Sequence, residues 1–263
     1  MPEGDTIFRA AATMRKALAG RTVTGVGGSV RDVAEAEPSL EGLRVRDVRA
    51  AGKHLLVRFD DGRTLRTHMR MTGSWHLYRP GERWQKPASG ARVVIETAER
   101  VAVCFHAPEV ELLAEGAEAR SAVGRLGPDL LAPDADPREI ASRWRGRPEL
   151  PVGVAVMRQA LAAGIGNVYK SETLFLCGVD PFRRAGDLTD ETLLEIARTA
   201  RRLMLDNLRG RAPRTTRHAP GRGRLWVYGR GGKPCYRCGT PIRMRRQGED
   251  GRSTYFCASC QAG

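Results

Sequence analysis

Two short cysteine pairs, 235-CYRC-238 and 257-CASC-260, decide the architecture of the C-terminal end of the chain. Eighteen residues separate the pairs, a spacing typical of a zinc ribbon, in which four thiolates hold one Zn²⁺ beside a β-hairpin. Four thiolates leave no coordination position for water, so the expected zinc is structural and not catalytic. The alternative, four unrelated thiols, leaves the paired spacing unexplained. The predicted ligands are Cys235, Cys238, Cys257 and Cys260.

Positive charge surrounds these cysteines. From Arg209 onward arginines and lysines recur, and only Glu249 and Asp250 oppose them before Cys257. The whole chain of 263 residues has 44 Lys and Arg against 30 Asp and Glu, a net charge of +14. A run of charged residues commonly forms a solvated surface. A run that is almost entirely positive on a zinc ribbon instead favours contact with phosphates. No stretch approaches the ~20 apolar residues of a membrane span, and no secretory leader is recognisable. We therefore expect a cytosolic protein that binds nucleic acid and no membrane.

The chain begins MPEGDT. Removal of the initiator methionine would leave Pro2 with a free secondary amine, and only at this position is a proline nitrogen a usable nucleophile. Proline also suits the first turn of a helix, so both interpretations, helix start and nucleophile, stay open. The residues that follow predict a helix with Asp5 or Thr6 as its N-cap and a stop at Gly20.

From about residue 22 to 113 the chain consists of short strand-like segments. Asp61-Gly62, between two of them, is a hairpin turn signal. Many short strands with alternating apolar residues indicate a β-sandwich or barrel-like domain. The segments are TVTGV, LRVRDVR, HLLVRF, TLRTHM, SWHLY, ARVVIET and RVAVCF.

A connector rich in Ala, Gly and Pro follows over 114–136, and helical patterns come after it. Thr189 is the expected N-cap of the last helix, with a Leu188/Leu193 hydrophobic staple across it. The predicted helices cover 137–144, 152–164, 167–178 and 189–208.

The segment LAAGIGN, residues 161–167, joins two of these helices through a glycine turn. Gly164 and Gly166 would let the backbone approach a ligand closely, and the next helix offers its N-terminal N–H groups to an anion. Asn167 is expected to cap that helix. Two packed helices often need such a corner, so the segment alone does not establish a binding site.

Two loops in the strand region have unusual composition. In AGKHLL, Lys53 follows a glycine and precedes an apolar strand, and it is either a surface residue or a functional cation. In HMRMTGSW, Met71 either packs into the core or serves as a wedge pushed into a base stack.

In sequence order, these segments resemble the Fpg/Nei (formamidopyrimidine-DNA glycosylase/endonuclease VIII) family of bifunctional DNA glycosylases. The matching motifs are MPEG, GKHLL, HMRMTGSW, RLGPDLL, GIGNVYKSE and the cysteine-rich tail, and they cover essentially the full chain. The resemblance implies an α+β multidomain fold, with a β-sandwich flanked by helices, a helix-two-turn-helix domain and a zinc ribbon. The expected boundaries are a catalytic domain over 1–117, a linker over 118–136, a helix-two-turn-helix domain over 137–224 and a zinc finger over 225–263.

The resemblance also implies a mechanism. Pro2 would attack C1′ of the damaged nucleotide, expel the base and form a Schiff base, with Glu3 as general acid/base at the sugar. Lys53 would assist base loss and β-elimination, and Arg252 would hold phosphate and assist δ-elimination. Matches to DNA-backbone and void-filling positions are found at Arg70, Arg125, Asn167 and Met71.

The chain departs from the family pattern at two places. Many members carry glutamate where this chain has Thr6, and the segment 207–224 lacks the longer lesion loop of the formamidopyrimidine branch. These departures, with Gly4 and the HAPEVELL stretch, favour the endonuclease VIII branch and oxidised pyrimidines as substrates. The alternatives are preference for 8-oxoguanine, formamidopyrimidine or abasic sites, a non-catalytic binder of damaged DNA, and a zinc-ribbon RNA-binding protein. We expect one structural zinc, no organic cofactor, damaged DNA as partner, a monomer and a cytoplasmic, nucleoid-associated location.

Overall fold

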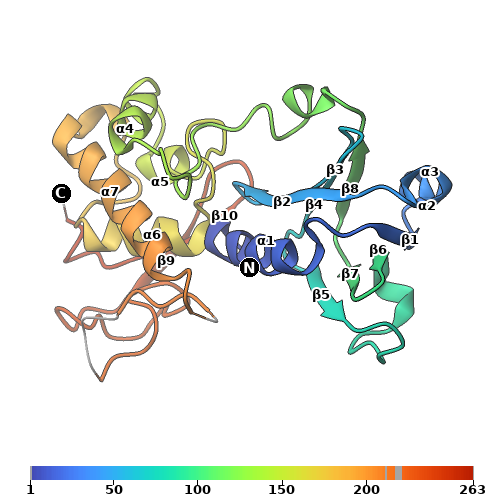
Figure 1. The fold of residues 1–263 in the computed structure, drawn as a ribbon. Helices are drawn as coiled ribbons and strands as arrows, with labels where there is room; N and C mark the ends of the chain where they lie inside the picture. Colours follow the sequence, from blue (N-terminus) through green and yellow to red (C-terminus); the bar gives the residue numbers. More distant parts are fainter. Residues whose placement is uncertain (1, 211, 217–220, 263) are drawn as a thin grey trace. The chain divides into compact units, whose positions relative to one another are not determined.

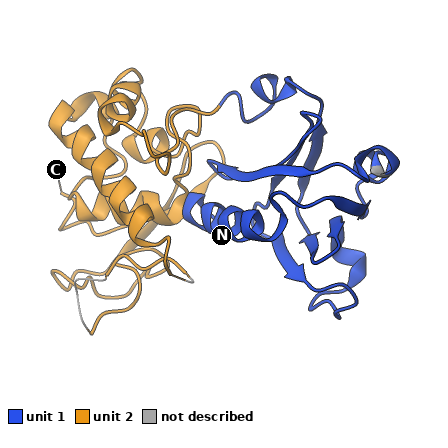
Figure 2. Cartoon of the chain, viewed as in Figure 1, with its two compact units in different colours: residues 1–125 blue, residues 126–263 orange. Residues whose placement is uncertain are grey.

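The computed structural model describes residues 2–210, 212–216 and 221–262, and the chain forms two compact units, residues 1–125 and 126–263 (Figure 2). Met1 lies outside the described residues, as do Arg211 and Arg217 of the basic run that starts at Arg209 and part of the segment 207–224. Among the described helices, none is long and apolar enough to cross a membrane.

The first unit is a β-sandwich of two four-stranded antiparallel sheets, in the orders β1-β6-β7-β5 and β2-β3-β4-β8 (Figure 1). Inward side chains of both sheets meet in one core, with Leu55 and Val57 from one side and Val93 and Ile95 from the other. The seven predicted strand segments are confirmed, and the eighth strand, Glu109–Leu113, was missed. The strands are β1 (Val23–Gly27), β2 (Val45–Ala51), β3 (His54–Phe59), β4 (Thr64–His68), β5 (Ser74–Tyr78), β6 (Ala91–Thr97), β7 (Val101–Phe105) and β8 (Glu109–Leu113).

Helices cover this sandwich at its ends. Helix α1 (Gly4–Leu18) packs against β2 and β3 through an apolar stripe that includes Ile7, Met14 and Leu18. The short helices α2 (Arg31–Glu35) and α3 (Glu37–Leu40) and the 3-10 turns η1 (Ala88–Gly90) and η2 (Ala117–Arg120) were not expected from the sequence.

The start of α1 differs from the prediction. Glu3, and not Asp5 or Thr6, is the N-cap, because its carbonyl oxygen accepts hydrogen bonds from the backbone N–H groups of Thr6 and Ile7. Asp5 is fully buried and pairs with Arg9 across one helical turn at 3.4 Å, so its carboxylate lies inside the helix face and does not cap it. The whole of MPEGDT after Pro2 and Glu3 is therefore helical.

The second unit contains α4 (Pro137–Arg145), α5 (Val152–Ala155), α6 (Asn167–Leu176), the 3-10 turn η3 (Ala185–Asp187), α7 (Asp190–Asp206) and the hairpin of β9 (Arg243–Gln247) and β10 (Arg252–Phe256) (Figure 1). Its helices share a core around Trp144, Tyr169 and Leu174. Thr189 caps α7, as predicted, by accepting a hydrogen bond from the N–H of Thr192 at 3.2 Å.

The helix predicted over 152–164 is helical only as far as Ala155. Beyond it the chain turns around the amide of Gln159, which donates to the carbonyls of Met157 and Ile165 and accepts from the N–H of Gly164. These side-chain hydrogen bonds stand where a continuing helix would have backbone hydrogen bonds. The apolar residues whose spacing predicted a helix therefore pack in a compact turn.

Helix α6 joins the helical part of this unit to the ribbon through buried polar side chains. The carboxylate of Glu172 is fully buried and accepts hydrogen bonds from the N–H groups of Trp226, Val227 and Tyr228 at 2.7–2.8 Å, and from the hydroxyl of Thr215. Burial raises the pKa of Glu172, and these four donors oppose that rise. The interaction fixes the segment that leads into the zinc ribbon.

We expect Glu172→Ala to lower the free energy of unfolding by about 3 kcal/mol or more, because it leaves several backbone N–H groups without an acceptor. Urea unfolding followed by circular dichroism measures the change. Glu149→Ala, at an exposed loop position, is the control and should stay within about 0.5 kcal/mol of the native protein. Equal midpoints for the two variants would contradict the assignment.

Candidate functional site

The N-terminal residues are held at the positive end of a helix. Pro2 is half-buried and immediately precedes Glu3, which is 1% exposed and is the N-cap of α1. The partial positive charge at a helix N-terminus disfavours a protonated amine there. Pro2 lies before the cap and outside the helix, so it does not itself form the first turn of α1.

Lys53 lies at the tip of a two-residue hairpin between β2 and β3. Ala51 pairs with His54 across this turn, and Gly52 takes a positive φ of 56° that favours glycine. Lys53 itself is half-buried. Since α1 packs against β2 and β3, the helix capped by Glu3 contacts the two strands whose turn carries this lysine.

Strand pairing brings this hairpin and the methionine loop to the same end of the β2-β3-β4-β8 sheet. His54 on β3 lies opposite His68 on β4, and His68 lies opposite Glu109 on β8. The two imidazole rings meet edge to face, with centroids 4.7 Å apart. Lys53, just before His54, and Arg70, just after His68, therefore emerge at the same end of the sheet.

The loop over residues 69–73, here called the Met71 loop, decides between the two interpretations of Met71. Met69 is 3% exposed and belongs to the core, whereas Met71 is 72% exposed. Core packing of Met71 is therefore excluded. Gly73 closes the loop by donating its N–H to the carbonyl of Met69 at 2.8 Å, and a Cβ there would lie only 2.7 Å from Met69.

Charge is tightly balanced beneath the Met71 loop. Burial, followed by the fields of His68 and Arg66, lowers the pKa of His54 to about 3, so its Nδ1 accepts a hydrogen bond from Arg66. Burial likewise lowers the pKa of His68. Burial acts to raise the pKa of Glu109, but the hydrogen bond from Arg70, the field of His68 and the bond from Arg66 bring this pKa below its usual range. At neutral pH two neutral imidazoles thus lie beside an ionised carboxylate.

In the second unit, Asn167 is the first residue of α6 and not its cap. Gly166, with extended backbone angles, is the N-cap, and the side chain of Asn167 instead donates from Nδ2 to the Ser253 hydroxyl of β10 at 3.0 Å. Asn167 is 3% exposed, and its Oδ1 accepts no hydrogen bond from the described residues. Gly164 has a φ of 105°, as the expected glycine turn requires.

Arg252 begins β10 and pairs with Asp250 in the hairpin turn at 3.3 Å. It lines a hollow of about 380 Å³ together with Arg158 and Lys170. Lys170 is 1% exposed and donates to the hydroxyl of Thr254 at 2.7 Å. This hollow gathers three cations within the second unit, of which the sequence analysis had named only Arg252.

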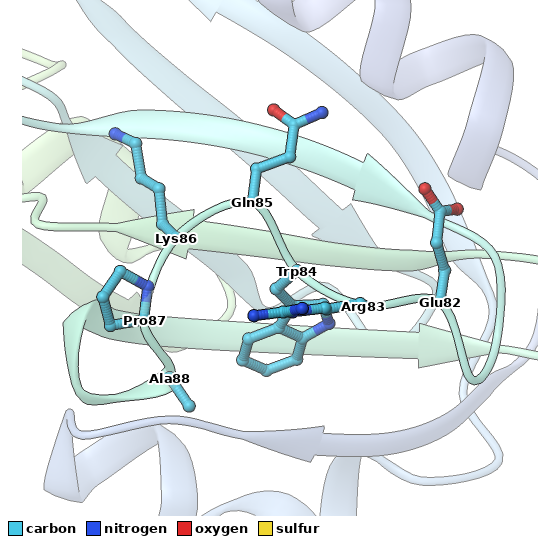
Figure 3. Close-up of a pocket in the computed structure, with 7 residues that line it drawn as sticks. All are labelled: Glu82, Arg83, Trp84, Gln85, Lys86, Pro87 and Ala88. Carbon is cyan, nitrogen blue, oxygen red and sulfur yellow. The ribbon is translucent and has the colours of Figure 1, made fainter.

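Arg125, the remaining predicted residue, and a second hollow in the first unit are separate from the groups of residues described above. Arg125 is exposed and is the last residue of the first unit. A hollow of about 620 Å³ is lined by the single loop Glu82–Ala88 (Figure 3). Trp84 of this loop packs against Tyr78 and Phe105. None of the predicted site residues lines this hollow, so it does not mark the candidate active site.

Sequence reasoning missed the residues that support the site. His54 and His68 stand inside the motifs GKHLL and HMRMTGSW, and Lys170 and Glu172 stand inside GIGNVYKSE. Their position in those motifs was a usable signal. The pairing of Glu109 with Arg70 had no such signal, because the two residues are far apart in the sequence.

The four cysteines of the tail form a metal centre. The Sγ atom of Cys238 lies 3.5 Å from the Sγ atoms of both Cys257 and Cys260, and the Sγ atoms of Cys235 and Cys260 are 3.9 Å apart. A tetrahedral Zn²⁺ with Zn–S bonds of about 2.3 Å places its sulfurs about 3.8 Å apart, so the four thiols fit this ion. Four thiolates would fill the coordination sphere of the ion, and Cys257 directly follows β10, as expected for a structural site at a hairpin.

Family models match three parts of the chain. The formamidopyrimidine-DNA glycosylase N-terminal domain matches residues 1–110, the H2TH domain of the same glycosylase matches 126–217, and the zinc finger found in FPG and IleRS matches 232–263. The chain therefore belongs to the formamidopyrimidine-DNA glycosylase family. The four-cysteine centre accordingly holds one structural zinc.

Relatives and solved structures agree with this membership. The chain is 44% identical to a probable endonuclease 8 2 of Streptomyces coelicolor, over 100% of this chain and 95% of the relative. It is 40% identical to the DNA-(apurinic or apyrimidinic site) lyase Nei2 of Mycolicibacterium smegmatis, over 99% of each. The fold matches that of the Lactococcus lactis glycosylase in complex with DNA containing an abasic site, with a TM-score of 0.84, 20% identity and 100% coverage of both chains.

We expect the purified protein to contain one zinc per chain by elemental analysis. Cys238→Ala should lower this content well below one and reduce thermal stability, because metal binding contributes directly to folding of the ribbon. Cys177→Ala, outside the cluster, should retain full zinc. A Cys238→Ala protein with unchanged zinc and melting temperature would refute the assignment.

The low pKa of His54 predicts a dependence of stability on pH. Between pH 6.5 and about 3 the unfolded chain binds a proton at His54 that the folded protein does not, so stability falls as the pH is lowered. One such proton gives a slope of up to about 1.4 kcal/mol per pH unit. His68, Arg66 and Lys53 oppose protonation of His54, and Glu109 favours it. Urea unfolding from about pH 7 to 5 should give a flatter slope for His54→Gln, and equal slopes would exclude this cause.

Proposed function

We propose that this protein, a DNA glycosylase and AP lyase of base-excision repair, removes oxidised pyrimidines through a Schiff base to Pro2. The observation that carries the proposal is the placement of Pro2 at the N-terminal end of α1, directly before the buried Glu3. The activity class is supported by relatives named endonuclease 8 and DNA-(apurinic or apyrimidinic site) lyase.

Imine chemistry requires a neutral amine. An ordinary α-amino group has a pKa of ~7.7–8.0, and the helix N-terminus disfavours its protonated form. The nitrogen lone pair of Pro2 forms a bond to C1′ while the bond from C1′ to the base breaks, and the base leaves with the electron pair and takes up a proton. Covalent catalysis of this kind divides one difficult substitution into easier steps.

Strand cleavage follows from the same intermediate. Opening of the sugar ring yields an iminium ion, which acidifies the C2′ proton; loss of that proton breaks the bond from C3′ to its phosphate oxygen. A second elimination at C5′ releases the other phosphate. In this scheme Glu3 exchanges protons at the sugar, Lys53 assists base loss and the first elimination, and Arg252 holds the phosphate that leaves in the second.

Extrusion of a base from a duplex costs a few kcal/mol and leaves a gap in the stack. Met71, an exposed apolar side chain at the apex of its loop, is suited to fill that gap. Arg70, Arg125 and Asn167 would contact the DNA on either side of the lesion. The basic ribbon adds phosphate contacts, whose contribution falls as salt concentration rises.

The preference for pyrimidines rests on the departures from the formamidopyrimidine branch. Thr6 replaces the glutamate of many members, and the nearby buried carboxylate is that of Asp5, which is tied to Arg9. The protein is further proposed to act as a monomer on damaged DNA, in the cytoplasm and associated with the nucleoid.

Borohydride reduction on a duplex that contains dihydrouracil tests the covalent step. The native protein should be trapped on the DNA, and Pro2→Gly should lose trapping and base excision by at least about a hundredfold, because the secondary amine is gone. Pro80→Gly, at an exposed loop position, is the control and should behave as the native protein. An unimpaired Pro2→Gly variant would exclude Pro2 as the nucleophile.

The same assay on a panel of lesions tests the substrate class. Thymine glycol and dihydrouracil should be excised faster than 8-oxoguanine and formamidopyrimidines. The reverse order would overturn the pyrimidine preference while leaving the lyase mechanism intact. Absence of any adduct with a bare abasic site would refute the enzyme activity itself.

A further inference from the structure

We propose that Glu109 is a positioning residue that holds Arg70 and thereby keeps the Met71 loop in the conformation that enters a duplex. The inference rests on the proposed role of Met71 as a wedge. It adds a residue of β8 whose side chain lies behind the loop and need not touch the damaged nucleotide.

The backbone of Arg70 is the first observation. Its φ is 42°, in the left-handed region that non-glycine residues rarely adopt. Such a conformation persists only where surrounding contacts determine it. At Arg70 two contacts do so: its N–H donates to Nδ1 of His68 at 3.3 Å, and its side-chain Nε donates to Oε1 of Glu109 at 2.6 Å.

Glu109 is itself anchored from below. Its other oxygen, Oε2, accepts a hydrogen bond from Arg66 at 3.3 Å, and the Arg66 side chain is only 9% exposed. Arg66 is fixed in turn by Glu111 at 2.9 Å and by Nδ1 of His54 at 3.0 Å. The carboxylate of Glu109 is therefore a fixed acceptor at the base of the loop and not a freely rotating surface group.

The other side of the loop is closed independently. Thr72 donates its hydroxyl to the carbonyl oxygen of His106 at 3.0 Å, and His106 also has a left-handed φ, of 52°. Gly73 leaves no room for a side chain against Met69 and Ala107. Hydrogen bonds thus hold the Met71 loop on both sides of Met71. Glu109 provides the one to Arg70, and His106 provides the one to Thr72.

The geometry is compatible with phosphate binding by the same arginine. Glu109 engages the Nε and Nη2 side of the Arg70 guanidinium. A guanidinium has five N–H donors in a fixed fork, so its Nη1 side can meet a phosphate while the carboxylate retains the other side. Glu109 therefore orients Arg70 toward DNA, and a loop ordered beforehand avoids an ordering cost during binding.

Glu109→Gln tests the inference because it keeps the size of the side chain and removes its charge. Single-turnover base excision from duplex DNA should fall at least about fivefold, whereas cleavage of a single-stranded abasic oligonucleotide, which needs no wedge, should stay within about twofold of the native rate. Glu111→Gln is the matched control. It neutralises one carboxylate beside Arg66, which is still held by Nδ1 of His54 and by Glu109, and it leaves the contact between Glu109 and Arg70 in place, so the ratio of the two rates should be unchanged.

A second readout separates positioning from folding. Fluorescence of 2-aminopurine placed opposite the abasic site reports insertion into the stack without any chemistry, and its change should be reduced in Glu109→Gln. Thr72→Val, which removes the tie on the far side of the loop, should lower duplex excision in the same selective way and provides a second variant should Glu109→Gln fail to fold.

Three results would overturn the proposal: unchanged duplex excision in Glu109→Gln, equal losses on duplex and single-stranded DNA, or equal effects of Glu109→Gln and Glu111→Gln. Inactivity of the native protein on every abasic substrate would instead refute the proposed function. The two failures are therefore distinguishable.

Discussion

The register of the β2-β3-β4-β8 sheet is the constraint on which the candidate site depends. It places His54, His68 and Glu109 in one cross-strand row, with Lys53 and the Met71 loop at its end. Side chains alternate between the two faces of a strand, so a slip of one residue in β4 would turn His68 away and separate the two loops. Core residues such as Leu65, between Thr64 and Arg66, oppose that slip because they would be moved to the wrong face.

Buried charge plays the corresponding part in the second unit. Glu172 and Lys170 both belong to α6, and their side chains are buried. The carboxylate of Glu172 accepts a hydrogen bond from the N–H of Val227, and the ammonium group of Lys170 donates one to the hydroxyl of Thr254 on β10. Burial of such groups is costly unless hydrogen bonds satisfy them. These bonds form only when the ribbon is in place, so the zinc hairpin is bound to the helices by specific polar contacts as well as by apolar packing.

Much of the fold could be predicted from local patterns. Alternating strands, the cap at Thr189 and the spacing of the cysteines each depend on a few neighbouring residues, and the structure confirms them. The true caps of α1 and α6 were missed because backbone carbonyls and glycine do that work at Glu3 and Gly166, and neither has a distinctive side-chain signal. Long-range partners were missed for a different reason. The pairing of Glu109 with Arg70 depends on a register fixed by the whole sandwich, and no local pattern encodes it.

The exposure of Met71 also determines which methionine of this loop oxidants would modify. A thioether that is 72% exposed meets the same reactive oxygen species that damage bases, whereas Met69, two residues earlier and 3% exposed, is shielded by the core. Conversion of a methionine to its sulfoxide makes a flexible apolar side chain polar, and reductases reverse the change. In the proposed role, sulfoxide formation would therefore act on the wedge and spare the sheet beneath it, so oxidative loss of function would be both selective and repairable.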